Sequence, residues 1–318
     1  CGPIVSGIIL KFFDWKSLFA FFMIVITLIM VMAGTGLIRD VMPRHETVLD
    51  WLSVILSVGL IGIMYVVNLA AKKDVNWLLN GLILVVSVAA IIWFCYRQLH
   101  LAEPLLELRV LKTFNYDLAV LLTSISYIAL IVTTIIFPLY YQGVLHVSPF
   151  VSGMALVPGA VFLSILNPLS GKLADKIGFK PTMLVGMVMI ICGWLVGLTM
   201  LSRLSLVAMI LCAMIIEGGN AFVMMPAVTL GANSLPDKLV PHGTAVITTV
   251  RQVLGSAGVA VATIVLTVAS EHALSAGSKP LAANLHGYHL VFIMMVVIEL
   301  VGLVLAVMLK NTKKQGAK

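Results

Sequence analysis

The fold follows from residues 149–201, which read PFVSGMALVPGAVFLSILNPLSG, KLADKIGFK and PTMLVGMVMIICGWLVGLTML in succession. The first and third of these stretches, 149–171 and 181–201, contain no Asp, Glu, Lys or Arg. A helix crosses the hydrocarbon core of a bilayer with about 20 predominantly apolar residues. The sequence therefore predicts two membrane-spanning helices that are joined by a short charged segment at 172–180.

The same pattern extends along the whole chain of 318 residues, of which 61% are hydrophobic and 10% are charged. A water-soluble domain carries about 25% charged residues and about 45–50% apolar residues. This composition excludes soluble enzymes and nucleic-acid-binding modules. No segment shows the alternation of apolar and polar residues, over about ten residues, that is typical of a membrane β-barrel strand. We therefore expect an all-α polytopic membrane protein.

Apolar runs that end at charged or turn residues mark the individual spans. A partial span is expected at about 1–11, and nine complete spans are expected at about 17–38, 51–71, 77–96, 117–141, 149–171, 181–201, 205–232, 243–270 and 288–309. Most of the 20 Lys and Arg residues lie in alternate connections and in the carboxyl-terminal tail. Because basic residues gather on the cytoplasmic side of a membrane protein, the carboxyl terminus is expected in the cytoplasm. Since the chain opens inside an apolar run and without Met, we expect an amino-terminal part of a longer protein to precede Cys1.

The charged segment within the opening stretch predicts a tight cytoplasmic loop. It contains Gly171, Asp175, Lys176, Gly178 and Lys180, for which the family resemblance given below implies a role in conformational switching. The glycines permit positive φ angles in such a reversal. Asp175 could pair with the lysines or accept hydrogen bonds from the first amides of the next helix. An ordinary positively charged loop is the alternative interpretation of the lysines.

Three ionisable residues fall inside predicted spans, namely Glu217, Arg251 and Glu299. Each costs at least about 2.5–3.5 kcal/mol at a helix centre, so each needs a partner or a function. Arg251 and Glu299 lie roughly 12 and 15 Å from the cytoplasmic ends of their spans, a level at which they could form an ion pair. A role in substrate binding or coupling is the alternative for both, and extension toward the cytoplasm is a further one for Arg251.

Glu217 lies about 22 Å from the cytoplasmic end of its span, with no basic residue at its depth. It could exchange a proton with a cavity, attract a cationic substrate, or stay protonated and hydrogen-bonded to a neighbouring helix. Asn167 and Pro168 interrupt another span and predict a kink that lines a central cavity, with simple packing as the alternative. Met225 and its neighbours could form an adaptable wall for ligands, although methionine is also ordinary on a lipid-facing helix. The seven histidines show no metal-ligand spacing, so no metal site is predicted.

The segment 171–181 resembles the G-x-L-a-D-r-x-G-r-[KR] signature of the major facilitator superfamily, which joins the second and third helices of a six-helix half. Two further motifs resemble signatures of the fourteen-helix drug:proton antiporters, the EmrB/QacA group. The antiporter signature G-P-x-x-G-G is similar to the stretch that contains Gly2, Pro3 and Gly7. A signature near the end of these antiporters, with R-Q followed by glycines, is similar to the stretch that contains Arg251, Gln252, Gly255 and Gly258.

This resemblance, which is strongest to lincomycin-resistance exporters, implies a partial major facilitator fold. Residues 1–38 would be a remnant of the amino-terminal bundle, 39–114 two linking helices, and 115–318 the complete carboxyl-terminal six-helix bundle. It also implies export of small amphipathic or cationic drugs in exchange for protons, without a cofactor. The expected setting is the plasma membrane of a bacterium, in contact with lipid, as a monomer and without nucleic acid.

Two other interpretations stay open, and a third, an intramembrane enzyme, is not supported by the sequence. The chain could belong to a major facilitator with another small-molecule substrate, or to a truncated transporter that carries nothing because its partner bundle is missing. An intramembrane enzyme would need His, Asp or Glu clustered at one depth, and the sequence offers no such cluster.

Overall fold

A computed structural model describes residue 9 and residues 14–35, 50–69, 76–101 and 104–310. Every regular element in these residues is helical, and eight helices are long and apolar enough to cross a membrane. The α-helices are α2 (Trp15–Gly34), α3 (Trp51–Ser57), α4 (Gly59–Leu69), α5 (Trp77–His100), α6 (Phe114–Gly143), α7 (Pro149–Ala155), α8 (Val157–Ile177), α9 (Phe179–Met200), α10 (Leu206–Asn233), α11 (Val240–Ser275) and α12 (Pro280–Met308). Short 3₁₀ helices are η1 (Leu108–Lys112), η2 (Leu201–Arg203) and η3 (Asp237–Leu239).

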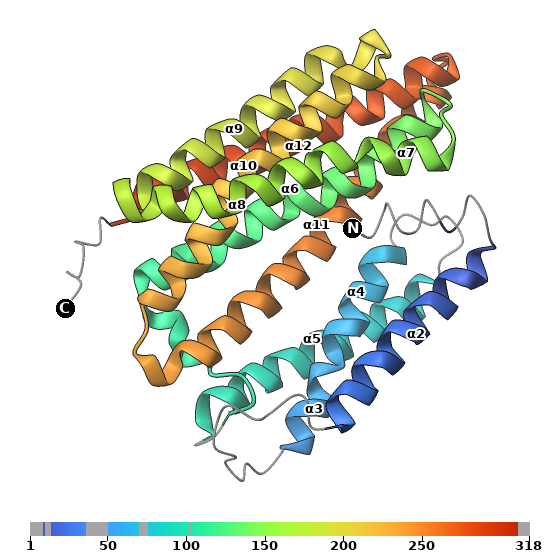
Figure 1. Cartoon of the computed structure of the whole chain (residues 1–318). Coiled ribbons are helices and arrows are strands. Elements are labelled where there is room, and N and C mark those ends of the chain that lie inside the picture. Colours follow the sequence, from blue (N-terminus) through green and yellow to red (C-terminus); the bar gives the residue numbers. More distant parts are fainter. Residues whose placement is uncertain (1–8, 10–13, 36–49, 70–75, 102–103, 311–318) are drawn as a thin grey trace.

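Helices α6 to α12 form one bundle, most of which lies in the upper part of Figure 1, while α11 runs below it toward the lower left. Helix α10 packs against α6, α8 and α9, and α12 packs against α6, α9 and α11. Their buried faces meet in an aromatic group in which the Phe137 and Phe292 rings are stacked with centroids 5.6 Å apart. The Trp194 ring meets Phe292 edge-on at 5.0 Å. The core is therefore filled by side chains from α6, α9 and α12, and many large apolar side chains are exposed on the outside.

Helices α9 and α10 cross with their backbones in close approach. A Cβ atom placed on Gly186 would lie 2.7 Å from the Gly219 carbonyl oxygen, and one placed on Gly219 would lie 2.7 Å from the Gly186 carbonyl oxygen. Small residues at facing positions are the usual means by which membrane helices pack closely. This pair of glycines therefore fixes the distance between α9 and α10.

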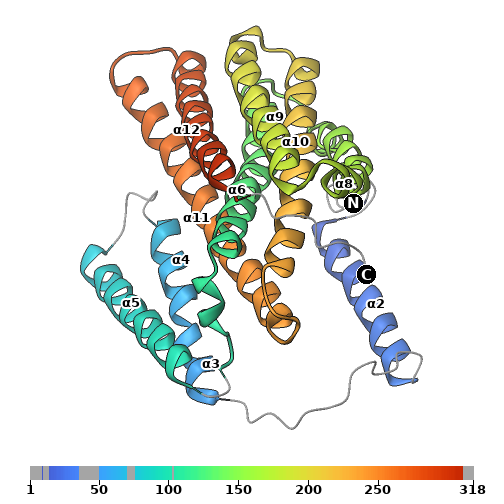
Figure 2. The same ribbon diagram turned by 90° about the vertical axis from the view of Figure 1, so that its left-hand side faces the viewer.

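Helices α3, α4 and α5 form a separate hairpin that touches the bundle through α4 and α11 (Figures 1 and 2). Asp50, just before α3, accepts hydrogen bonds from Arg97 near the end of α5, with Nε–Oδ2 at 2.7 Å and Nη2–Oδ1 at 3.0 Å. Gln98 donates to Ser53 Oγ, and its Oε1 accepts from the Leu106 amide. The Arg97 and Ser53 hydrogen bonds hold the pKa of Asp50 well below its ordinary value. These hydrogen bonds thus join the start of α3 to α5, and they join α5 to the segment that leads into α6.

Two predicted spans are interrupted by breaks. The span expected at 51–71 consists of α3 and α4 on either side of Val58, and the span expected at 149–171 consists of α7 and α8 on either side of Leu156. The second break has a local cause, because Pro158 has no amide hydrogen to donate to the carbonyl group of Met154. The division of the chain into 1–38, 39–114 and 115–318 stays a prediction.

Candidate functional site

A cavity of about 540 Å³ lies between α8 and α10. Asn167 and Pro168 line it from α8, and Met225 and Pro226 line it from α10. The residues that the sequence marked as a kink and as an adaptable methionine wall therefore share one cavity. Its size falls in the range of about 300–1,000 Å³ that is typical of pockets for small organic ligands.

Glu217 lies on the same helix interface, nearer the start of α10 than the cavity residues. A Cβ atom placed on Gly159 of α8 would lie 3.1 Å from Glu217 Cγ, so the carboxyl group projects from a point of close helix contact. Glu217 is 8% exposed, and among the described residues its carboxyl group has no hydrogen-bond or ion-pair partner. Helices α8 and α10 run in parallel, and eight residues of helix separate Glu217 from Met225, or about 12 Å. The α8–α10 interface therefore holds an unpaired acid and, about 12 Å away along α10, a cavity that the acid itself does not line.

Glu299, on α12, does not form the ion pair that the sequence suggested. The residue is fully buried, and both of its carboxyl oxygens lack a hydrogen-bond partner within the described part of the chain. One turn farther along α12, a Cβ atom placed on Gly302 would lie 2.9 Å from Met187 Cε on α9 and 3.0 Å from Ile125 Cγ2 on α6. This face of α12 is turned into the bundle core, which is why depth alone did not bring Glu299 to Arg251.

Arg251 faces α6 instead. Its guanidinium carbon lies 5.4 Å from the centroid of the Tyr127 ring, a cation–π arrangement. The Tyr127 hydroxyl donates a hydrogen bond of 2.7 Å to Gln252 Oε1, and a Cβ atom placed on Gly255 would lie 2.6 Å from the same ring. Gly258 makes a similar close approach to Ile128. The late-helix motif therefore packs α11 against α6 around Tyr127.

Two buried polar residues join α6 to α10 at the centre of the bundle. Ser126 Oγ donates a hydrogen bond of 2.5 Å to Asn220 Oδ1, and both residues are fully buried. Asn220 Nδ2 has no partner among the residues that the structure describes. Sequence reasoning missed Ser126, because serine is common in membrane helices and only its contact with Asn220 distinguishes it.

The predicted loop at 171–181 is wrong in extent, because α8 continues through it. Gly171, Asp175 and Lys176 lie on α8, and the reversal takes place at Gly178 alone, with φ 99° and ψ 163°. The burial pattern of this stretch is that of a helix with one exposed face, since Ala174 is buried while Asp175 and Lys176 are exposed. The charges therefore mark the end of a helix rather than a loop.

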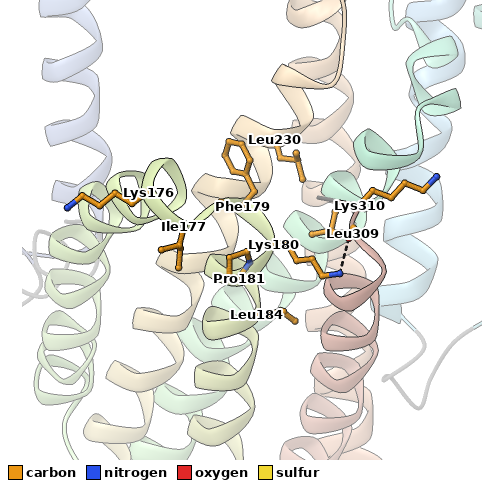
Figure 3. A pocket seen from close by; sticks show the side chains of 10 residues that line it. Lys176, Ile177, Phe179, Lys180, Pro181, Leu184, Leu230, Leu309 and Lys310 are labelled. Atoms are coloured by element: carbon orange, nitrogen blue, oxygen red, sulfur yellow. Dashed lines mark hydrogen bonds between the residues drawn. The ribbon is translucent and has the colours of Figure 1, made fainter. Parts of the chain in front are cut away.

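Lys180, on the first turn of α9, caps the end of α12. Its Nζ donates hydrogen bonds to the carbonyl oxygens of Val307 at 2.6 Å and Leu309 at 3.0 Å. Figure 3 shows this side chain directed toward Leu309, at the wall of a second cavity of about 440 Å³. A lysine at a helix C-terminus interacts favourably with the unpaired carbonyl groups and the helix dipole. The predicted switch residue is thus held by α12 in this conformation.

The antiporter motif of Gly2, Pro3 and Gly7 lies outside the described residues. Within the described ranges, no group of three or more His, Cys, Asp or Glu residues is placed to hold a metal ion.

Comparison with known proteins places this arrangement in context. Residues 1–260 match the profile of the Major Facilitator Superfamily. The chain is 34% identical over 316 residues to an uncharacterized MFS-type transporter, YcnB, of Bacillus subtilis, covering 98% of the chain and 66% of that protein. It is 30% identical over 322 residues to the lincomycin resistance protein LmrB of Listeria monocytogenes, covering 98% of the chain and 67% of that protein. A multidrug resistance protein B homolog of Mycobacterium tuberculosis is 25% identical over 281 residues, covering 85% of the chain and 51% of that protein. The chain spans about two thirds of the length of the first two relatives.

Proposed function

Because this chain belongs to the major facilitator superfamily, a family of membrane transporters, we propose that it exports small amphipathic drugs from bacterial cells in exchange for protons. Transport would proceed by alternating access in the plasma membrane, with the carboxyl terminus in the cytoplasm. Relatives that are named for resistance to lincomycin and to multiple drugs support export as the direction and drugs as the cargo.

The observation that carries the proposal is the pairing of a cavity with an unpartnered acid on the α8–α10 interface. A charged carboxylate is expensive in the membrane interior, whereas its protonated form is not. The buried Glu217 therefore destabilises the protein more when its carboxyl group is charged than when it is protonated. A cationic ligand near α10 would favour the charged form, so ligand binding and proton release are linked.

The second part of the proposal concerns the α8–α9 reversal. The resemblance assigns a switching role to this segment, and Lys180 is bonded to the end of α12 in this conformation. Release of these two hydrogen bonds would free the first turn of α9 from α12. We expect the segment to move in this way when the transporter changes from one access state to the other.

The test is to express the gene that encodes this chain in a bacterial host that lacks its own drug exporters. Cells should accumulate less lincomycin than the empty host, and an uncoupler that collapses the proton gradient should remove the difference. In inverted membrane vesicles, lincomycin should cause proton movement that a pH-sensitive dye reports. Glu217→Gln should abolish this proton movement at normal membrane insertion, while Glu271→Gln, which alters an exposed carboxyl group at the end of α11, should not.

Each outcome bears on a separate statement. Export that persists without a gradient would refute proton coupling. Transport of another small molecule without drug export would refute the cargo. Unchanged coupled export by Glu217→Gln would remove Glu217 from the mechanism.

A further inference from the structure

The cavity between α8 and α10 is lined by two hydroxyl groups whose hydrogens are already bonded within their own helices. Ser164 Oγ donates its hydrogen to the Ala160 carbonyl oxygen at 2.8 Å, and Thr229 Oγ1 donates to the Met225 carbonyl oxygen at 3.0 Å. A hydroxyl group has one hydrogen and two lone pairs. Both hydroxyls line the cavity, and because their hydrogens are engaged within their own helices, they offer lone pairs to a ligand.

Helix α8 also carries a backbone carbonyl group without its usual helical donor. Pro168 stands four residues after Ser164 and has no amide hydrogen, so the Ser164 carbonyl group lacks its ordinary helical donor. Asn167 is the lining side chain that retains N–H donors, and its amide also carries an acceptor oxygen. The balance of the wall is therefore strongly toward acceptors.

The cavity wall carries one acidic side chain, and Lys172 and Lys176 occupy exposed positions of the same helix on either side of it. Asp175 is the one charged residue that lines it, at the end toward the α8–α9 reversal. Within the described residues this carboxyl group forms no ion pair, and Lys176 and Lys180 line the second cavity instead. Figure 3 shows Lys180 directed toward Leu309, whereas the Lys176 side chain extends away from the other labelled residues. The apolar part of the wall comes from Pro168, Met225 and Pro226.

We infer that this cavity selects amphipathic ammonium compounds that carry at least one N–H group over quaternary ammonium compounds and over anions. A protonated amine donates to the lone pairs of Ser164 and Thr229 while its charge faces Asp175, and its apolar part contacts Met225 and the prolines. A quaternary ammonium carries the same charge but no donor, so the acceptors lose their partners. The inference names the substrate class of the site and rests on the proposed function.

The experiment compares two cations with the same apolar part, protonated dimethyl(phenylbutyl)amine and trimethyl(phenylbutyl)ammonium. Their affinities for the purified protein in lipid nanodiscs are measured by calorimetry near neutral pH. We expect the N–H compound to bind at least about tenfold more tightly, because a hydrogen bond that involves a charged group is among the stronger ones. The matching carboxylate, phenylpentanoate, should bind more weakly than either. Equal affinities for the two cations, or tighter binding of the anion, would overturn the inference.

Variants locate the selectivity in this cavity. Ser164→Ala combined with Thr229→Val should bring the affinity ratio of the two cations close to one. Thr199→Val, which removes an exposed hydroxyl bonded to its own helix outside the cavity, should leave the ratio unchanged. Asp175→Asn changes an exposed residue and can be used if the double variant unfolds. It should lower the affinity for both cations and raise the affinity for the anion. The assignment would be refuted if the affinity ratio of the two cations is unchanged in the double variant, or if the cation affinities are unchanged in Asp175→Asn.

Binding is measured without a proton gradient, so its failure is distinguishable from failure of the proposed export. Selective binding without drug export would refute the proposed function and leave the cavity assignment intact. Drug export with equal binding of the two cations would do the reverse.

Discussion

Replacement of Gly186 by Ala tests the close contact between α9 and α10. The added Cβ would lie 2.7 Å from the Gly219 carbonyl oxygen, 2.7 Å from Val223 Cγ2 and 2.9 Å from Phe222 Cβ. Ordinary contacts of a Cβ atom begin at 3.4 Å, so α9 and α10 would have to separate by about 0.7 Å. Two of these three atoms belong to the backbone or lie next to it, so rotation of one side chain cannot relieve the overlap.

The expected cost follows from two opposed terms. Overpacking of a well-packed core costs typically about 1–3 kcal/mol. Alanine is favoured over glycine within a helix by about 1 kcal/mol, which offsets part of that cost. Gly81→Ala on α5 supplies the matched control, because an added Cβ there meets no atom within 4 Å and only the helix preference acts. The difference between the two variants therefore isolates the overlap at about 1–3 kcal/mol, or roughly 5- to 150-fold in the unfolding equilibrium.

The assay is reversible unfolding of the purified protein in mixed micelles, with the free energy of unfolding measured for the wild type and both variants. We expect Gly81→Ala to equal or exceed the wild type in stability and Gly186→Ala to fall below Gly81→Ala by the amount above. Equal stabilities of the two variants would refute the close approach of α9 and α10 described here.

Two further substitutions test the α8–α9 reversal and the hairpin of α3, α4 and α5. Gly178→Ala should lower the free energy of unfolding by about 1–3 kcal/mol, since the backbone angles of Gly178 are essentially restricted to glycine. Gly171→Ala, in regular helix, is the control. Equal effects of the two substitutions would contradict the predicted backbone strain at position 178. Asp50→Asn should speed hydrogen exchange in α3 at neutral pH, because it removes the carboxylate that Arg97 binds. Because folding lowers the pKa of Asp50, this stabilisation is complete above the ordinary pKa of 3.8 and is lost as the pH falls through the lower pKa of the folded state. A difference between the wild type and Asp50→Asn that persists undiminished at very acidic pH would contradict the assignment.

The helical bundle could be predicted from the sequence because apolar length and charge position depend on local composition. The α10 span expected at 205–232 is found at Leu206–Asn233, and the α9 span expected at 181–201 is found within two residues. Helix ends were less predictable. Lys172 and Asp175 suggested a loop, but a helix tolerates charges on its exposed face, and only Gly178 stops it.

The candidate site was predictable in its members but not in its contacts. Residue counting gives the depth of Arg251 and Glu299, yet it does not give the direction in which each side chain leaves its helix. In the structure Arg251 faces Tyr127, whereas Glu299 is enclosed in the core. Asn167 and Met225, in contrast, were each suspected as cavity residues, and the packing of α8 on α10 brings them together. The hydroxyl groups of Ser164 and Thr229 gave no signal, because only their hydrogen-bond geometry reveals them as acceptors.

Because the chain reverses between α8 and α9 at a single residue, the number of residues in this connection determines which face of α9 points into the bundle. One extra residue next to Gly178 would advance α9 by about 1.5 Å and turn it by about 100°, since a helix has 3.6 residues per turn. Gly186 and Trp194, now on the buried face of α9, would then point away from α10 and the aromatic core. Insertions in this connection should therefore be far more damaging than substitutions, although it lies at the very end of the helices.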